Sequence, residues 1–108
     1  MAFQVHSLSL EMIAALRLLV ERIRKHDRSL ADQIVRAASS VALNIGEANG
    51  SDPGNRRARL HTAAGSASEV RSALQVAVAW GYVPPAQAQE ADALVDRVLA
   101  MLFRLRRG

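Results

Sequence analysis

Residues 28–50 read RSLADQIVRAASSVALNIGEANG, and this stretch decides the fold. Ser29 is a typical N-cap residue, and an acidic side chain, Asp32, follows three positions later. At the other end, Asn49-Gly50 is a typical helix stop. The stretch therefore predicts a helix over residues 29–49.

The middle of this helix is almost free of charge. Arg36 is the only charged residue between positions 33 and 46. A helix that is nearly uncharged all the way round usually buries more than one face, whereas a monomeric bundle needs to bury only one. We therefore expect the subunits to pack on each other as a homo-oligomer.

Length and composition narrow the class of protein. The 108 residues suffice for one domain with a real core, over residues 1–108. There is no cysteine, which excludes disulfides and thiolate metal sites. No segment reaches the ~18 consecutive apolar residues of a membrane span, and the first 20 residues lack the basic leader of a signal peptide. A cytoplasmic protein with no membrane partner is expected.

Apolar residues recur at steps of three and four in four segments, which is the spacing of bundle helices. The predicted helices cover residues 7–25, 29–49, 53–80 and 85–106. Asp52-Pro53 supplies a cap and a first helical residue for the third, Gly81 ends it, and Pro84-Pro85 precedes the fourth. Because short connections favour antiparallel neighbours, the expected fold is an all-α, antiparallel up-down-up-down four-helix bundle.

This topology would gather arginines at the end of the bundle where the third helix starts and the fourth ends, which we call the basic pole. Its predicted members are Arg56, Arg57, Arg59, Arg104, Arg106 and Arg107. The helix dipole explains cations at the end of the fourth helix but not at the start of the third. Six arginines together favour binding to the phosphates of RNA or DNA. The alternative is a protein-interaction scaffold whose arginines serve only solubility and helix ends.

Three polar residues lie on otherwise apolar helices: Asn44, Glu47 and Glu69. They would either hold a ligand or, as we favour, pair with arginines and fix helix register at an interface. Arg36 and Arg71 are the expected partners.

Residues 63–68 read AAGSAS, a run of small side chains inside the third helix. Gly65 there costs about 1 kcal/mol relative to alanine. So small a run lets another backbone approach closely, either from a second subunit or from within the same bundle. Both interpretations stay open, with a slight preference for the subunit contact.

Nothing in the sequence supports catalysis or a cofactor. No two of the three histidines, His6, His26 and His61, share a metal-ligand spacing. The serines lie in no nucleophile motif, so we expect a non-enzyme with no metal. Trp80 and Tyr82 could stack on bases, but a Trp-Gly-Tyr turn that closes the bundle is the favoured interpretation.

Three motifs carry a resemblance to a known family: RAASSVALNIGE at residues 36–47, AGSASE at 64–69 and AWGY at 79–82. Over roughly residues 8–105 the chain resembles the bacterial four-helix-bundle proteins encoded in 23S rRNA intervening sequences. The accessory variability protein of diversity-generating retroelements is similar. The resemblance implies a basic, barrel-like homopentamer and, for the retroelement relative, binding to nucleic acid and to a reverse transcriptase.

The chain departs from this family at one turn. The family usually continues Asn-Ile-Ala-Glu-Gly followed by Gly-Arg, whereas here residues 46–50 read GEANG and Ser51-Asp52 follows, so a basic residue is absent. The family's basic start to the third helix is matched by Arg56, Arg57 and Arg59.

Overall fold

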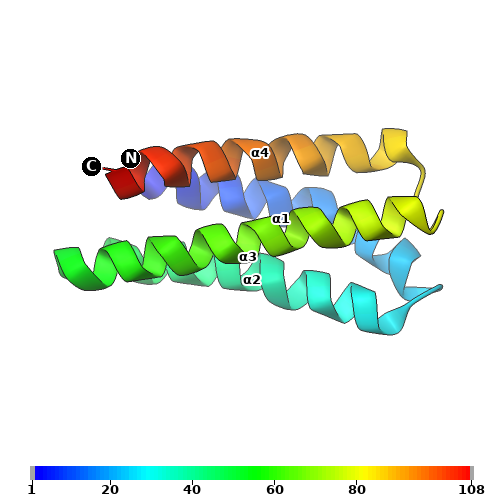
Figure 1. The fold of residues 1–108 in the computed structure, drawn as a ribbon, viewed down its shortest axis with the longest axis horizontal. Helices are drawn as coiled ribbons and strands as arrows, with labels where there is room; N and C mark the ends of the chain where they lie inside the picture. The colour runs from blue at the N-terminus through cyan, green and yellow to red at the C-terminus, as the bar shows by residue number, and fades with distance from the viewer. Residues whose placement is uncertain (1, 108) are drawn as a thin grey trace.

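A computed structural model describes residues 2–107, which form four helices. Their bounds are Ala2–Arg24 (α1), Arg28–Asn49 (α2), Pro53–Ala79 (α3) and Pro85–Arg107 (α4). The described residues include no strand. The helices lie alongside one another in a molecule measuring 42 × 22 × 18 Å (Figure 1). The predicted all-α, antiparallel four-helix bundle is confirmed.

Each helix packs against two neighbours, in the order α1–α2–α3–α4 and back to α1. One end of the bundle holds the start of α3 and the end of α4, so the basic pole exists as a place in the fold (Figure 1). The opposite end holds the α1–α2 and α3–α4 turns, residues 25–27 and 80–84, and we call it the turn pole.

The N-cap of α2 differs from the prediction. Asp27, and not Ser29, caps this helix: its carboxylate accepts a hydrogen bond from the backbone N–H of Leu30, at 3.0 Å. Asp27 has the extended backbone that a cap requires, with φ −156° and ψ 93°, whereas Ser29 already lies within the helix. The C-terminal stop lies where the sequence places it, because α2 ends at Asn49 and Gly50 is its C-cap.

The ends of α3 follow the local sequence closely. The Asp52 carboxylate accepts from the backbone N–H of Asn55 at 3.0 Å, and Pro53 is the first helical residue. The helix ends at Ala79, and two residues later Gly81 adopts a φ of 78°, a left-handed conformation that favours glycine. The outer helices run longer than the pattern predicts, since α1 begins at Ala2 and α4 continues to Arg107.

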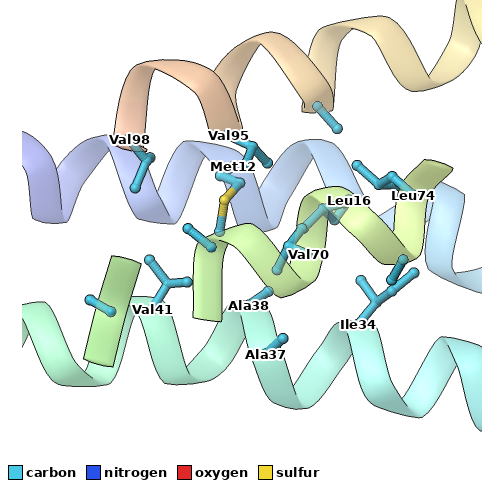
Figure 2. Close-up of a cluster of buried hydrophobic side chains, with 14 of the residues drawn as sticks. Met12, Leu16, Ile34, Ala37, Ala38, Val41, Val70, Leu74, Val95 and Val98 are labelled. Atoms are coloured by element: carbon cyan, nitrogen blue, oxygen red, sulfur yellow. The ribbon is translucent and has the colours of Figure 1, made fainter. Parts of the chain in front are cut away.

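The core lies along the bundle axis and is built from all four helices. Figure 2 shows a part of it in which Met12, Ile34, Val70 and Val95, one from each helix, are fully buried. Many of the α2 and α3 core residues are alanines, so the bundle is narrow. Ser9 is the one buried polar side chain among the residues whose burial is described, and it donates to the carbonyl of His6 at 2.6 Å.

The small-residue run of α3 packs mainly inside the bundle. Ala63 and Ala67 are fully buried, and the Ser66 hydroxyl hydrogen-bonds the Ser40 hydroxyl of α2 at 2.8 Å. Gly65 faces outward, and a Cβ there would meet no described atom within 4 Å beyond its own helix. The run therefore brings α2 and α3 together, and Gly65 and Ser68 are its two residues that face outward.

Candidate nucleic-acid interface

The start of α3 and the end of α4 bring arginines from both helices to one place. A depression of about 210 Å³ is lined by Arg56 and Arg57 from α3 and by Arg106 from α4. Its remaining lining residues are Ser51, Pro53 and Leu105. Side chains almost fifty residues apart in sequence thus border the same hollow, as the antiparallel topology predicts.

A second depression continues from the first. It measures about 640 Å³ and is also lined by Arg57 and Arg106, to which it adds Arg107. Because two arginines border both hollows, the two hollows adjoin on the surface of this end of the bundle.

A third depression, of about 550 Å³, extends this surface along α3 and α4. Arg104 and Arg106 line it, together with the outward-facing Gly65 and Ser68. No Asp or Glu of the described chain lines any of these three hollows. Five of the six predicted arginines therefore border connected depressions that contain no acidic side chain.

Arg59 is the exception, because it lies against α2. Its guanidinium is 3.1 Å from the Glu47 carboxylate and 3.4 Å from the Asn44 side-chain oxygen. The charge of Arg59 is thus locally balanced. The prediction that Arg36 or Arg71 pairs with Glu47 and Asn44 is wrong. Their partner is Arg59, because antiparallel packing places the end of α2 beside the start of α3.

The other predicted polar contacts are also rearranged. Arg71 forms an ion pair with Asp96 of α4. Glu69 is exposed and has no ion pair among the described residues. Nothing in the structure draws Glu69 into the basic pole.

The basic pole contains two rings that the sequence analysis did not identify, His61 and Phe103. The Nδ1 atom of His61 lies 3.1 Å from the Nη2 atom of Arg106. The guanidinium of Arg107 lies 5.5 Å from the centre of the Phe103 ring, in a cation–π contact. Phe103 and Arg107 are an i, i+4 pair, and that spacing is the signal that would have placed this ring beside an arginine. His61 meets Arg106 across two helices, so no local spacing signals that contact.

Asp52 is the acidic residue nearest in sequence to these arginines, and it is occupied by its own helix. Hydrogen bonds from the backbone and side chain of Asn55 hold the pKa of the Asp52 carboxyl below its usual value of 3.8. The negative charge thus stabilises the start of α3, where the helix dipole favours it.

No three His, Cys, Asp or Glu side chains in residues 2–107 are grouped so as to hold a metal ion. No described helix is both long and apolar enough to cross a membrane.

Fold and site together define a four-helix-bundle protein with a basic pole. The model of the 23S rRNA-intervening sequence protein family matches residues 2–104, and the chain belongs to this family. A protein of unknown function from the S23 ribosomal protein family of Bacteroides thetaiotaomicron VPI-5482 has a similar structure, with a TM-score of 0.89 and 20% identity over 96% of this chain and 99% of that one. At that identity the likeness shows the fold alone. A comparison with curated proteins finds no match.

Proposed function

We propose that this protein is a non-catalytic, cytoplasmic nucleic-acid-binding protein whose basic pole contacts the phosphates of RNA or DNA. The observation that carries the proposal is the set of three connected depressions lined by arginines of α3 and α4 and by no described acidic residue. Guanidinium groups bind phosphate oxygens with two parallel hydrogen bonds, and neighbouring phosphates of a nucleic acid can occupy neighbouring hollows.

The position of two of these arginines supports the proposal further. Arg56 and Arg57 lie near the start of α3, where the helix dipole disfavours positive charge. They also lie close to Arg106, so like charges are brought together. Neither arrangement stabilises the bundle, whereas a bound polyanion would offset both costs.

The proposed contacts carry little sequence information. Phosphate contacts position a nucleic acid, whereas base contacts specify it. We therefore expect the basic pole to bind RNA and DNA of different sequences with similar affinity, and to do so in a strongly salt-dependent manner.

A homo-oligomer is the second part of the proposal, and the family resemblance implies five subunits. On α1 and α2, Leu18 is 73% exposed and Leu43 is 67% exposed, although both are large and apolar. A groove of about 370 Å³ between these helices is lined by Ile13, Val20 and Val35, among others. Leu18 and Leu43 do not line this groove, so a second copy packed over it would bury the groove's apolar lining, and further subunit contacts would be needed to cover the two leucines. Repeated basic poles of such an oligomer would then bind one nucleic acid together.

The test is a comparison of two double variants with the same change in charge. Arg56→Glu with Arg57→Glu reverses two charges of the basic pole. Arg36→Glu with Arg97→Glu reverses two exposed arginines that form no ion pair among the described residues. Binding of a short fluorescently labelled RNA is followed by anisotropy at low salt.

Loss of binding is expected only in the Arg56/Arg57 variant. Both variants should unfold at close to the wild-type temperature, because glutamate near the start of α3 suits the helix dipole. Equal binding by both variants would overturn the assignment of the basic pole. If wild-type protein forms an oligomer by light scattering yet binds no RNA, the protein-interaction scaffold becomes the better account, and a reverse-transcriptase-like partner would then be the first to test.

A further inference from the structure

Three aromatic rings form a near-parallel stack at the turn pole. The rings of His26 and Tyr82 lie 5.1 Å apart with planes 5° from parallel. The ring of Trp80 lies 6.5 Å from that of Tyr82, with planes 17° apart. Tyr82 is therefore the middle ring, and His26 and Trp80 lie at the ends of the stack.

The Trp-Gly-Tyr turn lies at the end of the bundle and packs against the core through Tyr82, but Trp80 itself takes no part in closing the bundle, which differs from the interpretation favoured from sequence. The Trp80 side chain is 71% exposed, whereas Val83 is 1% exposed and fills the end of the core. The indole packs one face toward Tyr82, and most of its surface is left in solvent. Exposure of so large an apolar ring has no structural benefit that we can identify.

Contacts in both turns of the turn pole hold the stack in place. The backbone N–H of Tyr82 donates to the carbonyl of Ala77 at 2.9 Å, directly after the left-handed turn at Gly81. The Tyr82 hydroxyl lies 3.5 Å from the carboxylate of Asp27, the residue that caps α2. The middle ring, Tyr82, is thus held in place before any ligand arrives.

Positive charges flank the stack. Lys25 precedes His26 and Arg28 follows Asp27; both are exposed, and neither forms an ion pair among the described residues. The nearby acidic group Asp32 is already paired with Arg24, whose hydrogen bond lowers the pKa of the Asp32 carboxyl.

We propose that the exposed face of Trp80 stacks on an unpaired nucleobase, with Lys25 and Arg28 near the adjoining phosphates. A planar base would extend the existing stack by one ring, and every base has an aromatic face that can do so. This inference rests on the proposed nucleic-acid binding and adds a preference for single strands, because bases in a duplex are already stacked on one another.

The surroundings of Trp80 favour a base over a protein partner. Val76 is the only exposed large hydrophobic residue on the described α3, four residues before Trp80. A stable protein interface buries about 800 Å² on each partner, which one indole and one valine cannot provide.

Trp80 is the single tryptophan of the chain, so intrinsic fluorescence reports on this ring alone. The probe is an oligo(dT) strand of about 12 nucleotides, a length within the range that one small domain covers. An abasic strand of equal length has the same phosphates and no bases, and a duplex of that length has no unpaired bases.

Oligo(dT) should quench Trp80 emission, while the abasic strand and the duplex should bind and leave it nearly unchanged. Trp80→Ala should weaken binding of labelled oligo(dT) by about 5- to 150-fold, the effect of losing one stacked base, with no change for the abasic strand. Val76→Ala is the matched control on α3 and should bind oligo(dT) like the wild type. Circular dichroism checks that each variant is folded.

Two results would overturn the stacking proposal: oligo(dT) binds without quenching Trp80, or Trp80→Ala binds it as tightly as wild type. Either leaves the basic pole intact if the Arg56/Arg57 variant still loses binding. Equal weakening of oligo(dT) binding by Val76→Ala would show that the loss is not specific to the indole ring, and would also count against stacking. If no strand of any kind binds, both proposals fail together.

Discussion

Salt is expected to weaken the binding of duplex DNA to the basic pole steeply. Arg59 is balanced by Glu47, so five arginines of the pole are left to contact phosphates. Each phosphate contact contributes about −0.9 to the slope of log K against log salt on duplex DNA, which gives a slope of about −4.5 for one subunit. Between about 50 and about 200 mM salt, affinity should therefore fall by about 500-fold.

The Arg56→Glu, Arg57→Glu variant gives the internal check. With three arginines left, the slope should be about −2.7, and affinity should fall by about 40-fold over the same range. The assay is fluorescence anisotropy of a labelled duplex at four or more salt concentrations, with the Arg36→Glu, Arg97→Glu variant as the control for net charge.

Two results would contradict the assignment of the basic pole. If the wild-type slope is close to zero, binding does not depend on phosphate contacts. If the wild-type and Arg56/Arg57 slopes are equal, those contacts are made elsewhere on the molecule, and the three depressions are not the site.

Three further predictions concern the core, the start of α3 and the role of Arg59. Ile34→Ala removes a fully buried side chain and should lower the free energy of unfolding by about 2–5 kcal/mol in urea titrations; a loss below that range would mean that the core refills the space. Asp52→Asn should lower the thermal midpoint at pH 7. The folded-state pKa of Asp52 lies below its usual value of 3.8, so the stability its charge adds is present above that value and is lost as the pH falls through the lower pKa. The variant should therefore be less acid-sensitive than wild type by calorimetry. Because asparagine can still cap the helix, equal sensitivity would contradict the contribution of the charge. Arg59→Gln breaks an exposed ion pair with Glu47 and a long hydrogen bond to Asn44, so stability should fall by about 1 kcal/mol at most. Anisotropy should show RNA affinity within about twofold of wild type, and a large loss would place Arg59 in the site after all.

The class of fold was open to prediction because its signals are local. Apolar residues at steps of three and four mark the buried face of each helix, and Asp52-Pro53 and Gly81 mark ends that depend on neighbouring backbone groups. The start of α2 shows the limit of such reasoning. Ser29 and Asp27 are both good caps by residue type, and only the backbone conformation shows that Asp27 is used.

For the candidate site, the sequence predicted only which helix ends lie together. Short turns make neighbouring helices antiparallel, and this alone brings the start of α3 to the end of α4. Which arginines stay available depends on how far each helix is rotated about its own axis. That rotation turns Arg59 toward Glu47 of α2 and leaves Arg57 beside Arg106 of α4.

The sequence by itself determined the number of helices, both ends of α3 and the residues of the buried faces, because hydrogen bonding and apolar periodicity act over a few neighbouring residues. The tertiary structure alone decided the partner of Glu47, the three hollows of the basic pole, and the exposed ring stack of Trp80, Tyr82 and His26. These features join side chains from different helices and turns. Their distances follow from packing the whole bundle, and no short stretch of sequence encodes them.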